Sequence, residues 1–281
     1  MLKKHGFQIG KLIPIPEIIF KPGTLQLKPF KQKVRILIER DNFIIKTAEN
    51  NEDLAKALRL RYEIFYRELL EKKLISGMDI DRFDFKCDHL LIIDKKTGNY
   101  IGTYRLISSL FCKKFYSATE FKLDDIIKLE GTKLELGRAC VHRDYRTGSS
   151  IALLWRGIAD YMKETGTKYL FGCSSVKTTD RRLIAAMYRY FQESGMVSSE
   201  MRISPKGRFR MRNFEPVLNS ISAQEIKDAA GQIPPLIKSY IKMGAQICGE
   251  PALDKQFKCA DFLTLFNTEM SDQKVHRKYK I

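Results

Sequence analysis

KLELGRACVHRDYRTGSS (residues 133–150) is the stretch around which the rest of the chain is organised. Apolar residues predict a strand over 133–141, and those in 151–162 recur at the spacing of a helix that packs one face on a sheet. A helix N-terminus that follows a basic Gly/Ser turn is a natural phosphate site. The residues of this predicted phosphate site are Arg143, Arg146, Gly148, Ser149 and Ser150.

Gly137 interrupts the predicted strand, and a glycine in mid-strand usually marks a bulge or a close backbone approach. A bulge at this point would turn the charged pair Glu135 and Arg138 towards one cleft. We therefore expect the centre of the chain to carry both a charged cleft and an anion-binding turn.

A second apolar strand is expected at residues 168–174, directly after the central helix. Two strands joined through a helix favour a parallel pair. The predicted fold is α/β (α+β), a twisted mixed sheet flanked by helices. Four prolines oppose a long helix near the N-terminus. We interpret residues 1–45 as an arm packed on the domain and residues 46–281 as a single domain.

The formal net charge is +17, with 50 Lys plus Arg against 33 Asp plus Glu. Such an excess indicates an anionic partner, which could be nucleic acid, anionic lipid or an acidic carrier protein, although a solvated basic surface is the simpler alternative. Residues 201–212 end in period-two alternation with one basic face, which predicts a docking surface. The residues of this basic face are Lys206, Arg208, Arg210 and Arg212.

No run approaches the ~20 apolar residues of a membrane span, and the N-terminus lacks the apolar core of a signal peptide. We expect a cytoplasmic protein that could attach peripherally to the inner membrane. Two Cys-x-His pairs, Cys87/His89 and Cys140/His142, have a spacing that would suit zinc in a strand. Nothing else has ligand spacing, so we expect no metal site.

An acidic patch stands out in this basic chain: Asp79, Asp81 and Asp84. It is either a polar loop with turn-forming aspartates or a pocket for a cationic substrate. Arg61 is the one charged residue on the apolar face of a predicted helix. It is either a rim residue whose charged end reaches solvent or a partner of that pocket. These four residues are our candidates for acceptor binding.

ELGRACVHRDYR (residues 135–146) also resembles a known family. It is similar to the ornithine-acyl-ACP N-acyltransferases that begin ornithine-lipid synthesis, a group sometimes labelled hemolysin-like, within the GNAT superfamily. Acyl-homoserine-lactone synthases and long-chain N-acyl amino acid synthases are their relatives. Four further short strings, at 87–92, 102–106, 169–173 and 249–263, also resemble this family, and together with 135–146 they occur in the order expected for it. The usual GNAT loop, (Gln/Arg)-x-x-Gly-x-(Gly/Ala), is matched in part, because Arg146 stands where the first glycine belongs.

The resemblance implies a GNAT-like fold and an N-acyltransferase reaction. A (3-hydroxy)acyl thioester on acyl carrier protein would be attacked by the α-amine of ornithine, giving lyso-ornithine lipid. The acyl-phosphopantetheine thioester is then a co-substrate, no cofactor is bound permanently, and no nucleic acid is expected. Another amino acid acceptor, an autoinducer-type synthesis, or a non-enzymatic basic RNA- or membrane-binding protein are the alternatives.

The reaction needs a group that takes a proton from the amine. Glu135 is the candidate base, because its strand leads to the predicted donor turn, and an ion pair with Arg138 or Arg105 is its alternative role. His142 is the second candidate base. By the same resemblance, Arg105 and Arg138 hold the substrate or brace the site. Backbone N–H groups at a bulge are the expected donors to the thioester oxygen.

Overall fold

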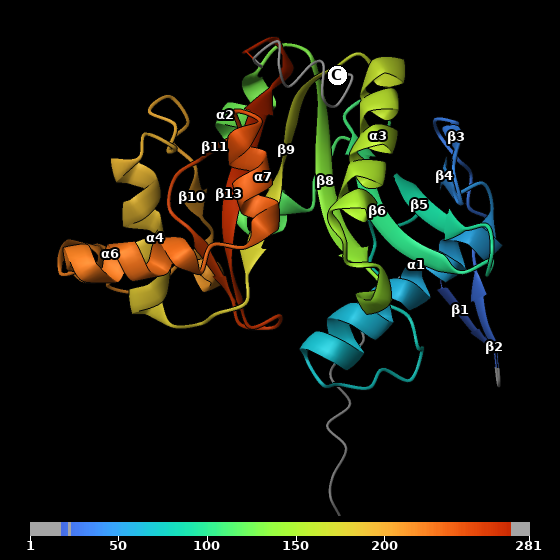
Figure 1. The fold of residues 1–281 in the computed structure, drawn as a ribbon, viewed down its shortest axis with the longest axis horizontal. Coiled ribbons are helices and arrows are strands. Elements are labelled where there is room, and N and C mark those ends of the chain that lie inside the picture. Colours follow the sequence, from blue (N-terminus) through green and yellow to red (C-terminus); the bar gives the residue numbers. More distant parts are fainter. Residues whose placement is uncertain (1–17, 22–23, 271–281) are drawn as a thin grey trace, which may run out of the picture.

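A computed structural model describes residues 18–21 and 24–270 and is built on a nine-stranded sheet in the order β11-β13-β9-β8-β6-β5-β4-β3, with β12 paired to β13 (Figure 1). Its strands are β3 (Leu37–Arg40), β4 (Phe43–Thr47), β5 (Asp88–Asp94), β6 (Tyr100–Ser108), β8 (Thr132–Val141), β9 (Thr167–Val176), β11 (Gln246–Ile247), β12 (Ala252–Asp254) and β13 (Cys259–Asn267). Two small antiparallel pairs accompany it: β1 (Ile18–Lys21) with β2 (Thr24–Leu27), and β7 (Phe121–Lys122) with β10 (Ser204–Pro205).

Helices cover both faces of this sheet. The α-helices are α1 (Asn51–Arg61), α2 (Asp124–Lys128), α3 (Gly148–Thr165), α4 (Arg181–Glu193), α5 (Phe214–Asn219), α6 (Ala223–Gly231) and α7 (Pro235–Lys242). A π-helix, η1 (Tyr62–Leu69), continues α1, and single 3-10 turns lie at η2 (Ser117–Thr119), η3 (Arg143–Tyr145), η4 (Gly207–Phe209) and η5 (Thr268–Met270).

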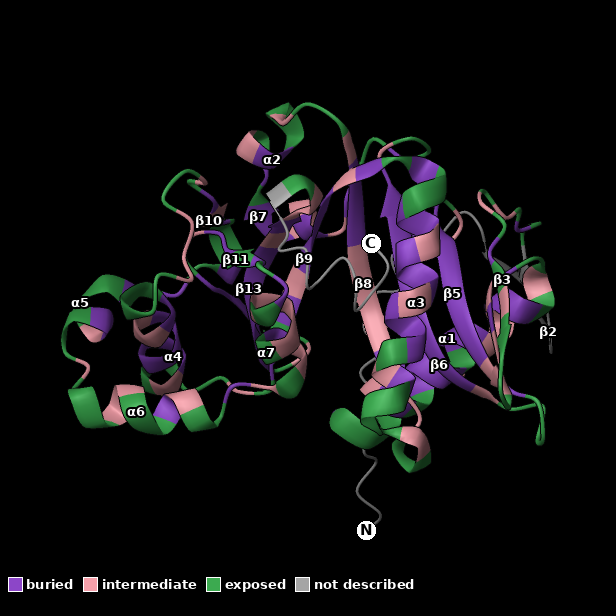
Figure 2. Ribbon diagram, turned by 45° about the horizontal axis from the view of Figure 1, so that its top comes forward, coloured by how far each residue is buried: buried purple, intermediate pink, exposed green. Residues whose placement is uncertain are grey.

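The alternation of side chains along strand β5 shows which helix covers which face of the sheet. Leu90 and Ile92 of β5 belong to the core under α3, whereas Leu91 between them belongs to the core under α1. Successive strand residues point to opposite faces, so α1 and α3 lie on opposite sides of the sheet. The central strands are accordingly buried on both faces (Figure 2). This confirms the predicted mixed sheet flanked by helices.

β8 and β9 form the parallel pair that the sequence predicts. They are paired from Thr132↔Thr167 to Glu135↔Phe171 and then separate, so that they lie side by side at the top of Figure 1 and apart at the bottom. Gly172 stands where they part, and a Cβ on it would lie 2.2 Å from the Leu136 carbonyl oxygen. Only glycine therefore fits this close approach, from which the two strands diverge.

The expected bulge lies beside Gly137. Opposite Tyr104 of β6, strand β8 holds two residues, Arg138 and Ala139, and the register shifts there. The strained residue is Arg138, with φ +52°, rather than the glycine. A bulge leaves a strand residue out of the ladder and redirects its side chain. Here it turns Arg138 out of the regular alternation.

Three local predictions need correction. The boundary at residue 45 falls inside β4, and β3 joins the main sheet, so this part of the predicted arm is an edge of the domain. Residues 1–17 of that arm lie outside the described residues. Ser149 and Ser150 of the predicted turn lie inside the first turn of α3, whose N-cap is Thr147, and the side chain of Thr147 makes no capping bond. Residues 208–212 alternate between exposed and buried, but residues 206–208 are all exposed, and the segment turns at η4 and is not a strand.

Candidate active site

A cavity of about 310 Å³ opens where β8 and β9 separate. Leu170 and Phe171 both line it, and neighbouring strand residues face opposite sides, so the cavity reaches through the gap to both faces of the sheet. Its apolar wall includes Tyr104, Trp155, Leu170, Ile237, Tyr240 and Phe266. Its polar wall includes Arg105, Tyr116, Glu120, Glu135, Arg138, Asp254 and Asp261.

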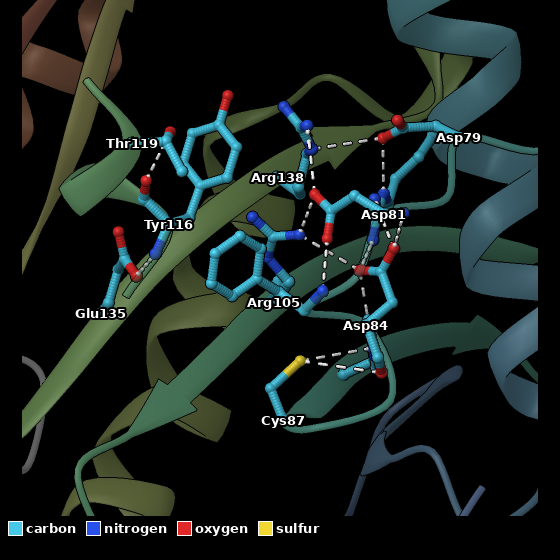
Figure 3. A network of polar contacts seen from close by, with 12 residues as sticks. Asp79, Asp81, Asp84, Cys87, Arg105, Tyr116, Thr119, Glu135 and Arg138 are labelled. Carbon is cyan, nitrogen blue, oxygen red and sulfur yellow. Dashed lines mark hydrogen bonds and ion pairs between the residues drawn. The ribbon is translucent and has the colours of Figure 1, made fainter. Parts of the chain in front are cut away.

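Beside this polar wall lies a buried network of three arginines and three aspartates (Figure 3). Arg61, at the end of α1, places Nε 2.8 Å from Asp79 Oδ2 and Nη1 2.7 Å from Asp84 Oδ1. Its side chain is fully buried. The alternative of a rim position for Arg61 is therefore wrong, because its charge is compensated by two carboxylates inside the protein.

Arg105 and Arg138 complete the network from the two paired strands β6 and β8. Arg105 Nη1 lies 2.6 Å from Asp81 Oδ2, and Arg138 Nη2 lies 3.4 Å from the same oxygen. Both guanidinium groups also stack on the ring of Tyr116, at 5.0 and 4.9 Å from its centroid. Such planar contacts add to the ion pairs and hold both guanidinium groups in fixed orientations.

The three aspartates have a structural role that the acceptor-pocket prediction did not foresee. Burial opposes the ionisation of Asp79, but Arg61 and Arg138 lower its pKa below the usual value. None of Asp79, Asp81 and Asp84 lines the cavity, and each is already paired with a guanidinium group. The acidic patch therefore positions Arg105 and Arg138 and presents no empty site to a cationic substrate.

Glu135 lines the cavity, as its strand position predicted, but its carboxylate has partners that sequence did not indicate. It accepts hydrogen bonds from the backbone N–H groups of Tyr116 and Ser117, both at 2.6 Å, and from the Ser117 hydroxyl. Burial raises its pKa, while the bonds from Ser117 act in the opposite direction. No ion pair joins it to Arg105 or Arg138 within the described part of the chain. The carboxylate thus fixes the turn that carries Tyr116 and Glu120.

The predicted phosphate turn lies at the N-terminus of α3, near the open end of the strand pair (Figure 1). Arg143, Gly148 and Ser149 are exposed, whereas Ser150 is buried and donates to the Tyr145 carbonyl. Arg146 makes a bidentate pair with Glu68 of η1, at 2.6 and 2.7 Å. Arg146 therefore ties the turn to η1, and Arg143 is the better-placed arginine for an anion.

The structure does not bring His142 and the Cys-x-His pairs together in the cavity. His142 does not line it, and its Nδ1 lies 3.6 Å from Asp144 Oδ2 on the half-exposed turn. Cys87 and His89 contact each other at 3.6 Å inside the core. The position of His142 gives no support to its role as a base.

Sequence reasoning missed a second acidic group, formed by Glu120, Asp254 and Asp261. Each offers an oxygen within 4.8 Å of the others, and all three line the cavity. Burial and the charge of Asp261 raise the pKa of Glu120 to about 9, and burial raises that of Asp261. Glu120 lies far from Asp254 and Asp261 in sequence, and strands β12 and β13, which carry the two aspartates, are buried almost throughout, so no spacing or period in the sequence pointed to this group.

The predicted basic face is exposed on one side of the molecule. Lys206, Arg208, Arg210 and Arg212 are exposed, while Phe209 and Met211 between them are buried. Lys206 Nζ donates to the Ala118 carbonyl at 2.5 Å, which links this face to the turn beside the cavity. In the described part of the chain, no helix has the length and apolar character needed to cross a bilayer.

Comparison with known proteins agrees with this geometry. Residues 60–156, which include β5, β6, β8 and the start of α3, match the family described as an acetyltransferase (GNAT) domain. The L-ornithine N(alpha)-acyltransferase of Rhizobium meliloti (strain 1021) is 29% identical over 237 residues, which cover 79% of this chain and 79% of that protein. The enzyme of the same name from Rhodobacter capsulatus is 29% identical over 252 residues, covering 85% of this chain and 94% of that protein.

Among solved structures, an N-acyl amino acid synthase from uncultured soil microbes aligns over 81% of this chain and 91% of its own, with 11% identity and a TM-score of 0.46. That overlap supports no conclusion about the chemistry. The match to the acetyltransferase (GNAT) domain covers residues 60–156, and the relatives that extend over most of the chain are named acyltransferases. The parting strands β8 and β9 and the cavity between them agree with both findings.

Proposed function

We propose that the protein is an L-ornithine Nα-acyltransferase that moves an acyl chain from a thioester donor to the α-amine of ornithine. The observation that carries this proposal is the cavity between β8 and β9, with an apolar wall on one side and arginines and carboxylates on the other. An acyl chain and a charged amino acid need these two environments side by side. The names of the curated relatives agree with this substrate.

The acyl donor enters from the open end of the strand pair. Its chain lies against the apolar wall, where each buried methylene contributes about 0.8 kcal/mol. The bulge at Arg138 leaves backbone N–H groups outside the β-ladder, at the strand that lines the cavity. Such donors stabilise the negative oxygen that develops when an amine attacks a thioester.

The phosphate of a phosphopantetheine arm is held at the N-terminus of α3. No side chain caps the helix there, so its first backbone N–H groups lack the side-chain acceptor that usually binds them. Arg143 adds a positive charge beside these groups. The arm then runs between the parted strands towards the bulge. This arrangement needs a thioester donor and no permanently bound cofactor.

We propose acyl carrier protein as the source of the thioester. The basic face of Lys206, Arg208, Arg210 and Arg212 is exposed and suits an acidic protein surface. The product with ornithine is then lyso-ornithine lipid, and the anionic membrane surface is the competing partner for the same face.

The proton of the α-amine must leave before attack, because only the neutral amine is nucleophilic. Glu135 was our candidate for this step. Its carboxylate already accepts three hydrogen bonds, so it can act as a base only by releasing one of them. We therefore propose that Glu135 is a positioning residue that holds the 116–120 turn against the cavity.

The test is acyl transfer in a purified system. The protein is mixed with 3-hydroxyacyl carrier protein and equal amounts of ornithine, lysine, glycine and glutamine, and products are identified by mass spectrometry. N-acyl ornithine as the main product supports the proposal. A preference for glycine or glutamine, or binding of RNA without any acyl transfer, would overturn it.

A further inference from the structure

The buried carboxylates Glu120, Asp254 and Asp261 form an unusual group in the wall of the cavity. They come from three separate segments: the loop after η2, strand β12 and strand β13. Their oxygens lie within 4.8 Å of one another, and each residue is at most 6% exposed. Ionised carboxylates that are this close together and this well shielded from solvent repel one another unless a proton or a cation lies between them.

Their protein partners do not supply that cation. Asp254 Oδ1 accepts from the backbone N–H groups of Gln256 and Phe257, at 2.7 and 3.1 Å, and Asp261 Oδ1 accepts from the Ser175 hydroxyl. Among the residues that the structure describes, no lysine, arginine or histidine forms an ion pair with any of the three. The group is therefore stabilised by hydrogen-bond donors and by the proton that Glu120 retains, and not by a cation among the described residues.

A second observation on the same cavity calls for an anion. Arg105 lines the cavity and is 1% exposed, yet its Nε has no hydrogen-bond partner within the described part of the chain. Its Nη1 is occupied by Asp81 and Asp84. A buried guanidinium N–H without an acceptor costs free energy that a bound carboxylate would recover.

We propose that Glu120, Asp254 and Asp261 bind the side-chain ammonium of the acceptor while Arg105 receives its α-carboxylate. The assignment rests on the proposed function and adds to it the residues that select a cationic amino acid. An ammonium group has three donors and a compact charge, so it can bond to three carboxylates at once. The α-amine, next to the carboxylate, is then held on the arginine side, near the bulge.

The same geometry predicts a proton release on binding. The raised pKa of Glu120, about 9, means that the empty site keeps a proton near pH 7.5. A bound ammonium stabilises the ionised carboxylates, so that proton is expelled as the acceptor enters. An acceptor without a side-chain charge gives no such release.

The experiment compares ornithine with norleucine, in which a methyl group replaces the side-chain ammonium. Glu120→Gln, Asp254→Asn and Asp261→Asn should each raise the KM for ornithine roughly 10- to 150-fold and leave that for norleucine within about threefold. Asp228→Asn removes a charge of the same kind from the exposed face of α6 and should change neither value.

Calorimetry on the unaltered protein covers the case in which a variant does not fold. Ornithine binding measured in two buffers of different ionisation enthalpy should release up to one proton at pH 7.5, and norleucine none. Equal losses for both acceptors, no proton release from the unaltered protein, or ornithine binding that requires a divalent cation would each overturn the assignment. If the protein acylates no amino acid at all, the proposed function fails as well, which is a different result.

Discussion

Glu135→Gln is the substitution that best separates the two roles of this carboxylate. In the structure one oxygen accepts from the Tyr116 N–H and the other from the N–H and hydroxyl of Ser117. Glutamine has the same shape but only one acceptor oxygen. Its NH₂ group must therefore face at least one of these buried donors.

The magnitude follows from the number of bonds. A hydrogen bond to a charged group contributes about 1.5–3 kcal/mol, and a buried donor left without an acceptor costs about 1–3 kcal/mol. If the amide oxygen keeps the two Ser117 bonds, the Tyr116 N–H loses its acceptor. We expect the free energy of unfolding to fall by about 2–5 kcal/mol, a large part of the 5–15 kcal/mol typical of a domain.

The assay is urea unfolding combined with a pH profile of kcat. We expect loss of stability together with a lower kcat, because the 116–120 turn also carries Tyr116 and Glu120 into the cavity. The pH profile of the remaining activity should keep its shape. Ser117→Ala is the matched control, since it removes one donor and leaves the carboxylate, and it should produce a smaller effect of the same kind.

A different result would refute this reasoning. If Glu135→Gln were as stable as the unaltered protein, and its kcat fell 10²- to 10⁴-fold and rose steeply with pH, then Glu135 would be the general base. The hydrogen bonds from Tyr116 and Ser117 would in that case be ones that the carboxylate gives up during the reaction.

Three further predictions follow from other sites. Because burial raises the pKa of Glu120 to about 9, the folded protein holds a proton that the unfolded chain has lost between about pH 4.5 and 9. The contribution of this proton to stability is complete below about pH 4.5, and the free energy of unfolding should fall by at most about 1.4 kcal/mol per pH unit up to pH 9. Urea titrations of Glu120→Gln should lack this slope. Arg61→Met leaves two buried carboxylates without their main partner and should lower the free energy of unfolding by about 3–5 kcal/mol, whereas a change below 1 kcal/mol would contradict the network. Arg208→Glu with Arg210→Glu should raise the KM for acyl carrier protein and weaken its salt dependence, and unchanged kinetics of a folded variant would reject that docking face.

Much of the fold was determined by local sequence. Apolar runs predicted the strands β8 and β9, and a helical apolar period predicted α3, because such patterns report which residues of an element meet the core. At the start of α1, Asn50 accepts from the N–H groups of Glu52 and Asp53, which is a cap formed by neighbours in the chain. Gly137 predicted a bulge in β8 that the structure places at the next residues. These features depend on neighbours in the chain, which a sequence displays directly.

The partners of charged groups were decided by tertiary structure alone. Asp79 and Asp84 were predicted to bind substrate, but the end of α1 brings Arg61 between them, where it forms ion pairs with both. Glu120 and Asp261 lie 141 positions apart in sequence and meet only because β13 returns beside β9, next to the loop that Glu135 holds. A charge acts on whatever lies within a few ångströms, and sequence spacing does not report that distance across a fold. Secondary-structure elements of this protein could therefore be predicted from its sequence, whereas the roles of its carboxylates could be assigned only from the tertiary structure.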